Sequence, residues 1–225
     1  MDAFTDGNPI FTRDGRRVVF SSNRDGLPQL YVADVATPEA PPRRVLTTTE
    51  RIPGGQPLGD GKTVLFRSDH GADENWSLFL CGLDGSGLTE LTKGVKMQRD
   101  DPTVPDGMPT TAFYSARVIS EVGSSAYSVE LAAGAREKKL YEEKLPGFLS
   151  PRIAVLRLSP DGARVTRTTV LESRTSFTEL PTTGAVVGDD FYFIANSQVD
   201  NERDGSIVDP GKLASVRIGV VRLPD

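Results

Sequence analysis

Residues 7–34 read GNPIFTRDGRRVVFSSNRDGLPQLYVAD, and this stretch decides the fold. Residues 17–22 and 29–34 are rich in β-branched and aromatic side chains, which predicts strands rather than helices. Residues 9–13 are expected to form a first strand, with proline at its start, where the missing N–H does no harm. The Asp-Gly pair at 14–15 supplies the positive φ angles of a tight hairpin. A short strand at 44–48 would complete a unit of four antiparallel strands.

The same pattern returns further along the chain. Residues 55–68 read GQPLGDGKTVLFRS, and a weaker third copy begins at residue 100. Asp-Gly pairs stand at 14, 60 and 106, so we expect them to mark equivalent corners at a spacing of 46 residues. One such sheet cannot bury both of its faces alone, so neighbouring sheets must stack. We therefore predict an all-β fold, a β-propeller of four-stranded antiparallel blades, with about four to five complete and partial blades.

The rhythm of the repeat breaks near residue 145. The next Asp-Gly pair, at 161–162, falls in a hairpin that we expect to join two outer strands. A second hairpin is expected over residues 183–197. We predict a single propeller domain, 1–225, built from blades of one kind in 1–145 and of another kind in 146–225.

Both parts resemble known propeller families. The pattern Pro-x-x-x-x-Asp-Gly, then hydrophobic residues, Ser-Ser-Asn-Arg-Asp-Gly and Leu-Tyr-x-x-Asp, resembles the repeat of TolB-type β-propellers, closely at 7–34 and with a two-residue gap at 55–93. Residues 151–225 resemble the C-terminal blades of gluconolactonase-like and NHL-type propellers, on Arg157–Gly162 and Phe191–Gln198. The first resemblance implies the fold and leaves function open, because such repeats occur in protein-binding propellers and in the propeller domains of peptidases.

The composition excludes several classes of function. The formal net charge is −5, so there is no general basic surface and nucleic acid is not an expected partner. The apolar runs are too short to span a bilayer, and no signal peptide is visible, which leaves periplasm and cytoplasm both open. Cys81 is the one cysteine and His70 the one histidine, so an internal disulfide and a Cys/His zinc site are excluded. Cys81 stands in an apolar run and is expected to be buried.

Loops that join the second and third strands of a blade emerge on one face of a propeller. The expected loops are 23–26, 69–75 and 196–210, and all are acidic and rich in Asn. Their convergence would gather carboxylates at the channel mouth, a usual place for ligands. The alternative is that these are ordinary turn residues with local hydrogen bonds. The candidate residues for binding a protein or a small ligand are Asn23, Asp25, Asp69, His70, Asp73 and Glu74.

Residues 200–207 are the sharpest candidate for a cation site. Oxygen-bearing side chains at alternate positions, followed by glycine at the sixth, resemble the first half of a calcium loop. The twelfth position is Gly211 rather than glutamate, so a structural acidic turn is the alternative. The likeness to gluconolactonase-like enzymes implies one divalent cation near Asn196. The candidate calcium ligands are Asn196, Asp200, Glu202 and Asp204.

Three functions follow from these observations. The first is a non-catalytic propeller that binds a protein or another partner through the loop face. The alternative is a calcium-dependent lactonase or esterase-like hydrolase, and the third is a partial propeller with no independent activity. The last expected strand, 215–223, would expose a sheet edge, so a homodimer through that open edge, or a missing N-terminal segment, is also predicted.

Overall fold

The structure is a computed structural model, and it describes residues 4–120, 123–142, 152–173, 177–178, 181–198, 201–203 and 206–224. Strands dominate the described residues and form antiparallel sheets, which confirms the predicted all-β propeller class. The chain divides into two compact units, 1–142 and 143–225. Whether they make one domain, as predicted, stays a prediction. No helix among the described residues has the length and apolar character needed to cross a bilayer.

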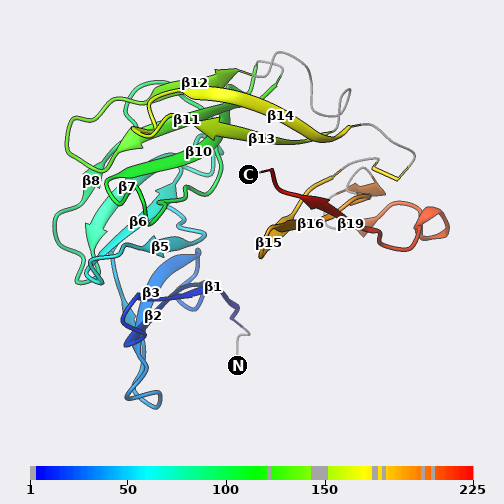
Figure 1. Cartoon of the computed structure of the whole chain (residues 1–225). Coiled ribbons are helices and arrows are strands. Elements are labelled where there is room, and N and C mark those ends of the chain that lie inside the picture. The colour runs from blue at the N-terminus through cyan, green and yellow to red at the C-terminus, as the bar shows by residue number, and fades with distance from the viewer. Residues whose placement is uncertain are drawn as a thin grey trace. The chain divides into compact units, whose positions relative to one another are not determined.

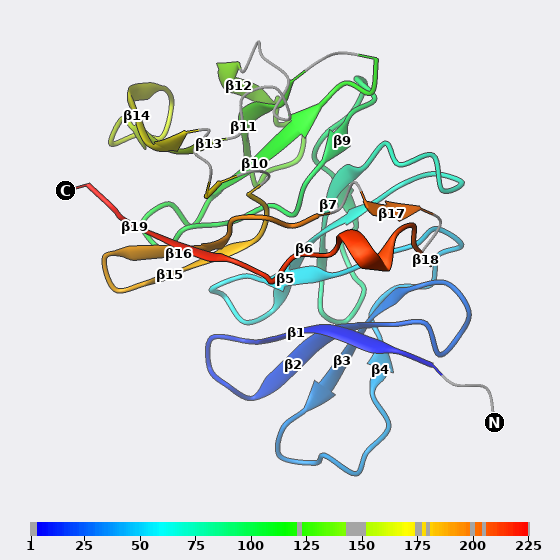
Figure 2. The same ribbon diagram turned by 90° about the vertical axis from the view of Figure 1, so that its right-hand side faces the viewer.

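The first unit contains three sheets of four antiparallel strands, each sheet in chain order (Figures 1 and 2). The first blade consists of β1 (Asp6–Phe11), β2 (Arg17–Ser22), β3 (Gln29–Asp34) and β4 (Arg43–Arg44). The second consists of β5 (Gly55–Pro57), β6 (Thr63–Ser68), β7 (Ser77–Gly82) and β8 (Thr89–Glu90). The third consists of β9 (Gln98–Arg99), β10 (Thr111–Arg117), β11 (Ser125–Glu130) and β12 (Lys138–Glu142).

The first strand differs from its predicted bounds. β1 starts at Asp6 and ends at Phe11, and its pairing with β2 shifts register between Gly7 and Ile10. This irregularity places proline inside the strand at a bulge, where its missing N–H removes no regular ladder bond. Asn8 takes a positive φ of 52°, and its side-chain amide donates to the Pro53 carbonyl at 2.9 Å. The prediction of a strand over 9–13 with proline at its start is therefore wrong.

The fourth strand of the first blade is shorter than predicted. β4 covers Arg43–Arg44, whereas the sequence predicts a strand over 44–48. The guanidinium of Arg44 donates to the carbonyl of Leu46 at 2.7 Å and to that of Thr48 at 2.8 Å. These bonds hold the segment in an irregular turn along the path to the second blade, so it does not continue as a regular strand.

The first two Asp-Gly pairs form hairpin turns as predicted, although glycine alone of each pair takes a positive φ, and the third pair does not form such a turn. Gly15 and Gly61 both have φ of 67°, and each N–H donates to the carbonyl three residues earlier, at 2.8 and 3.0 Å. Gly107 is not among the glycines with positive φ, and its loop closes instead through a Met108 N–H bond of 2.9 Å. The prediction of three equivalent corners is wrong at this position. Gly162, in the second unit, repeats the geometry of the first turn with φ of 65°.

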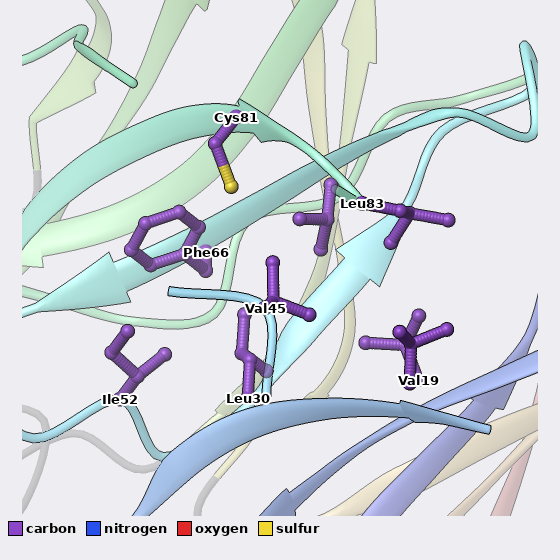
Figure 3. Packing of buried hydrophobic residues seen from close by; sticks show 9 residues of the cluster. Val19, Leu30, Val45, Ile52, Phe66, Cys81 and Leu83 are labelled. Carbon is purple, nitrogen blue, oxygen red and sulfur yellow. The ribbon is translucent and has the colours of Figure 1, made fainter. Parts of the chain in front are cut away.

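The core lies between the blades, because alternate residues of β6 face opposite neighbours. Val64 and Phe66 pack with Val19, Leu30 and Val32 of the first blade in a cluster shown in Figure 3. On the other face of β6, a second cluster joins the second and third blades; its fully or nearly fully buried members are Leu65, Leu78, Leu91, Met97, Ala112, Tyr114, Ala116 and Val129. Each blade interface of the first unit therefore contains a buried apolar cluster.

The second unit contains smaller sheets. The predicted hairpins are confirmed, the first in a two-stranded sheet and the second in a three-stranded one. The strands are β13 (Arg152–Leu158) and β14 (Val165–Ser173); β15 (Gly184–Val187), β16 (Asp190–Ile194) and β19 (Ile218–Arg222); and the short pair β17 (Glu202–Arg203) and β18 (Ser206–Ile207), followed by the 3-10 turn η2 (Pro210–Lys212). The last strand is shorter than the predicted 215–223.

Candidate functional site

The loop face of the first unit is built from the connections at one end of its blades. Loops 23–28 and 69–76 join the second and third strands of the first two blades, as predicted, and segments 45–54 and 91–97 join one blade to the next. The name loop face refers below to these four segments. Side chains of three of these segments, 45–54, 69–76 and 91–97, are linked to one another by ion pairs and hydrogen bonds, which fix the shape of that part of the surface.

Asp69 anchors the loop between β6 and β7. The residue is 3% exposed, and its carboxylate accepts three bonds from the Arg51 guanidinium, at 2.6, 2.9 and 3.0 Å. It also accepts a bond from the Glu74 N–H at 3.0 Å. Burial raises the pKa of Asp69, but these hydrogen bonds outweigh burial, so the pKa lies below its ordinary value. Asp69 is a charged group that holds the loop in place.

Asp73 and Glu74 attach the same loop to the third blade. Asp73 accepts a bond from the Asn75 N–H at 2.9 Å and one from Lys96 at 3.0 Å. These bonds lower the pKa of Asp73 to about 2. Glu74 accepts a bond of 3.1 Å from the side-chain amide of Gln98. Each of these carboxylates thus has a partner: the bonds from the Glu74 and Asn75 N–H groups are local, as in the turn alternative, whereas Arg51, Lys96 and Gln98 lie 18 or more residues away. Ligand binding at these residues stays a prediction.

His70 is a surface residue of the loop. Its side chain is 91% exposed, and Nδ1 lies 3.0 Å from a carboxylate oxygen of Glu50. The other oxygen of Glu50 accepts a bond from the Gly71 N–H at 2.7 Å. The pair joins the connector between the blades to the tip of the loop.

Trp76 ends the loop and was not predicted. Two guanidinium groups contact its half-buried ring, with Arg51 4.6 Å and Arg67 4.8 Å from the ring centroid. Arg51 is held by Asp69, and Arg67 lies 2.8 Å from the carboxylate of Asp101. The sequence feature that could have pointed to this site is the single tryptophan directly after an acidic loop. Arg51 and Arg67 belong to other segments, and only the folded chain brings them to the tryptophan ring.

A polar cavity of about 420 Å³ lies beside Trp76, between the second and third blades. It is lined by Arg67, Glu74, Trp76, Gln98, Arg99, Asp100, Ala116, Arg117 and Ser124. Arg117 donates to the side-chain oxygen of Gln98 at 2.7 Å. Cavities of this volume fall within the range of ligand pockets, roughly 300–1,000 Å³. The loop face therefore combines a fixed aromatic side chain with an adjoining polar recess.

The loop of the first blade is held separately. The side-chain oxygen of Asn23 accepts a bond from the Thr5 N–H at 2.6 Å, and Asp25 accepts one from the hydroxyl of Tyr31. Burial and the neighbouring Asp25 raise the pKa of Tyr31 to about 12. Arg24 stacks 4.9 Å from the centroid of the Tyr31 ring and 4.9 Å from that of Phe4. Four of the six predicted residues thus share one loop, whereas Asn23 and Asp25 belong to the first blade.

The structure describes two of the four predicted calcium ligands, Asn196 and Glu202. Asn196 is 1% exposed, and its amide bridges the Ser215 carbonyl, at 3.0 Å, and the Arg217 N–H, at 2.7 Å. Its oxygen is therefore already bound to a backbone donor. Glu202 lies in β17, and Asp200 and Asp204 lie outside the described residues. Within the described ranges no three His, Cys, Asp or Glu side chains gather at one point. Calcium binding stays a prediction.

Cys81 is buried, as expected, in the core between the first two blades. Burial, helped by the nearby charge of Asp84, raises the pKa of its thiol to about 11. Cys81 therefore packs as a small apolar residue of the core.

Comparison with known proteins identifies chains of similar fold. No protein-family model matches the sequence, and no curated protein matches it. Among solved structures, the chain is similar to an oligogalacturonate lyase in complex with manganese, with 14% identity over 82% of this chain and 57% of that chain and a TM-score of 0.58. It is similar to a chain in the crystal structure of a nidogen/laminin complex, with 11% identity over 84% of this chain and 72% of that one and a TM-score of 0.53.

TolB from Acinetobacter baumannii is also similar, with 16% identity over 86% of this chain and 51% of that chain and a TM-score of 0.44. The chain spans less than two thirds of the length of the lyase and TolB chains. Identities this low show the fold alone, and the fold is the β-propeller that the TolB-type repeat predicts. The likeness of residues 151–225 to gluconolactonase-like propellers stays a prediction.

Proposed function

We propose that this chain is a non-catalytic β-propeller that binds a partner protein through the loop face of its first unit. Trp76, which is half-buried and contacted by the guanidinium groups of Arg51 and Arg67, is the observation that carries the proposal. Tryptophan and arginine are the residue types that most often dominate the binding energy of protein interfaces, especially where they flank a recess. The polar cavity beside Trp76 is such a recess.

The ion pairs of the loop face favour binding because they order it in advance. Arg51, Asp69 and Asp73 are each held by at least two partners within the first unit. A surface whose side chains are already ordered loses little conformational entropy when a partner arrives. The alternating acids and bases also present a charge pattern that selects among partners. The nidogen/laminin structure shows that a similar fold occurs in a protein complex.

A displayed library of random peptides tests the proposal. The immobilised full chain is expected to enrich peptides that bind the wild-type protein. The Trp76→Ala substitution is expected to lower the affinity of these peptides at least about tenfold, which is the effect of an interface hot spot. Phe11→Ala is the matched control. Phe11 is an aromatic residue with 61% exposure at the end of β1 that lies away from the loop face. Circular dichroism checks that both variants are folded. Peptides that bind Trp76→Ala as tightly as wild type would contradict the proposal.

A further inference from the structure

A second cavity, of about 360 Å³, lies between the first and second blades on the other side of the 69–75 loop. Its floor is apolar. The rings of Phe66 and Phe79 stack with centroids 5.5 Å apart, and Leu46, from the connector, also lines the cavity and packs against the cluster that contains Phe66. Ile52 lies beside Phe66 at one end of the buried cluster (Figure 3). Leu88, at the rim, is 57% exposed.

Two carboxylates stand at the rim of this apolar floor. Cross-strand pairing places Phe66 opposite Phe79 and Phe79 opposite Glu90, so the three side chains form one row on the same face of the blade. Glu90 is half-buried, and among the described residues no arginine, lysine or other donor pairs with its carboxylate. Glu50 approaches from the connector and pairs with the exposed side chain of His70.

The third carboxylate of the cavity differs from these two. Asp69 is bound on both oxygens by Arg51, so its charge is already compensated inside the fold. Within the part of the chain that the structure describes, no lysine or arginine lines the cavity. An apolar floor with two carboxylates at its rim is therefore complementary to a ligand that has an apolar body and a positive charge.

We infer that this cavity accepts a segment of a partner protein in which a hydrophobic side chain lies next to a lysine or arginine. The hydrophobic side chain packs on the Phe66–Phe79 floor, and the cation lies at the rim with Glu50 and Glu90. There it replaces an exposed histidine as the partner of Glu50. An acidic segment would meet two like charges, and a purely apolar segment would leave Glu90 without a partner. The inference rests on the proposed function and names the chemistry of the partner.

Three blocked hexapeptides that differ in one central pair, Leu-Arg, Leu-Glu or Ala-Arg, test the inference on the full chain. Binding is followed by methyl NMR of Ile52 and Leu88. The Leu-Arg peptide is expected to shift both methyl groups saturably, and the other two to bind at least about fivefold more weakly. Equal binding of the Leu-Arg and Leu-Glu peptides, or no saturable shift below about 10 mM, would overturn the inference.

Matched variants separate charge from folding. Glu90→Gln keeps the size of the side chain and is expected to weaken binding of the Leu-Arg peptide about fivefold. The methyl shifts caused by the Ala-Arg peptide are expected to stay small in this variant. Glu39→Gln removes an exposed carboxylate from the loop between β3 and β4 and is expected to leave binding unchanged. Unaltered affinity in Glu90→Gln, with the protein folded, would count against the site.

The peptide library distinguishes this inference from the proposed function. Library peptides that depend on Trp76 but lack a hydrophobic–basic pair, and bind Glu90→Gln normally, would overturn the inference and leave the proposed function standing. If the library yields no peptide that depends on Trp76, the proposed function fails. Binding of the Leu-Arg peptide that depends on Glu90 would still support the chemistry of the cavity.

Discussion

The buried ion pair between the second and third blades gives a sharp prediction. Arg99 is 1% exposed and uses both edges of its guanidinium. Nε and Nη2 each donate to the Glu137 carboxylate at 2.7 Å, Nη1 donates to the Trp76 carbonyl at 2.8 Å and Nη2 to the Val95 carbonyl at 3.1 Å. The Tyr114 hydroxyl donates to Glu137 at 2.5 Å. One carboxylate therefore compensates a cation that water hardly reaches.

Glu137→Gln preserves the shape of this side chain and removes its charge. The Arg99 cation is then buried without compensation, and breaking one side of such a pair costs about 3–5 kcal/mol of the free energy of unfolding. Tyr114→Phe removes one hydrogen bond to a charged group and is expected to cost about 1.5–3 kcal/mol. Arg99→Met combined with Glu137→Leu removes both charges, so the double variant is expected to lose less stability than the two single variants summed.

Urea unfolding followed by fluorescence measures these differences, because Trp76 is the one tryptophan and its carbonyl accepts a bond from Arg99. Asp106→Asn is the control: it breaks the Arg13–Asp106 pair, whose side chains are 67% and 87% exposed, and is expected to change stability by less than about 0.5 kcal/mol. If Glu137→Gln costs no more than this control, or if the double variant is as unstable as the sum, the reasoning is refuted.

Four further predictions follow. The pKa of Asp73 in the folded protein is about 2, below the ordinary 3.8, so ionised Asp73 stabilises the fold above about pH 4 and this contribution to stability is lost as the pH falls from about 4 to about 2. In an acid titration of stability, Lys96→Met should show a smaller loss in this window than the wild-type protein. Gly55→Ala places a Cβ 2.9 and 3.0 Å from core side chains and should cost about 1–3 kcal/mol in thermal unfolding, whereas Gly107→Ala, in open space, should change stability by less than about 1 kcal/mol. Calorimetric titration with calcium should show saturable binding that Asn196→Ala weakens, if the hydrolase alternative is correct; no saturable binding ends that alternative. Mass measurement in solution should show a dimer if the open sheet edge pairs, and a clean monomer would contradict it.

The repeat alone predicts the blade architecture well, because strand identity is local. Alternating apolar residues and Asp-Gly turns specify β2, β3 and their hairpin, since each feature depends on neighbours a few residues away. The bounds of β1 depend on a bulge stabilised by a bond from Asn8 to Pro53 in the next connector, and no local pattern shows it. The third corner differs because its loop is longer around Gly107.

The position of the loop face could be predicted from the sequence, but the partners of its charged side chains could not. The turn composition of residues 69–75 predicts a polar loop, and the structure places it at one end of the second blade. The partners of its side chains, Arg51 and Lys96, lie in connectors on either side, and such contacts follow from how the blades stack. Trp76 acquires its position for the same reason. The sequence therefore predicts where polar residues gather and leaves open which charges are compensated.

The cavity beside Trp76 and the cavity above Phe66 and Phe79 are linked through the same short loop, 69–76. Asp69 fixes its start to the connector that lines one cavity, and Glu74 fixes its end to the third blade beside the other. The residues at both ends are held by charge-assisted bonds within the fold, which are shorter and stronger than neutral ones. A partner that covers the loop would meet surfaces already in place on both sides. Binding at such a surface depends on the chemistry of the partner more than on rearrangement of the propeller.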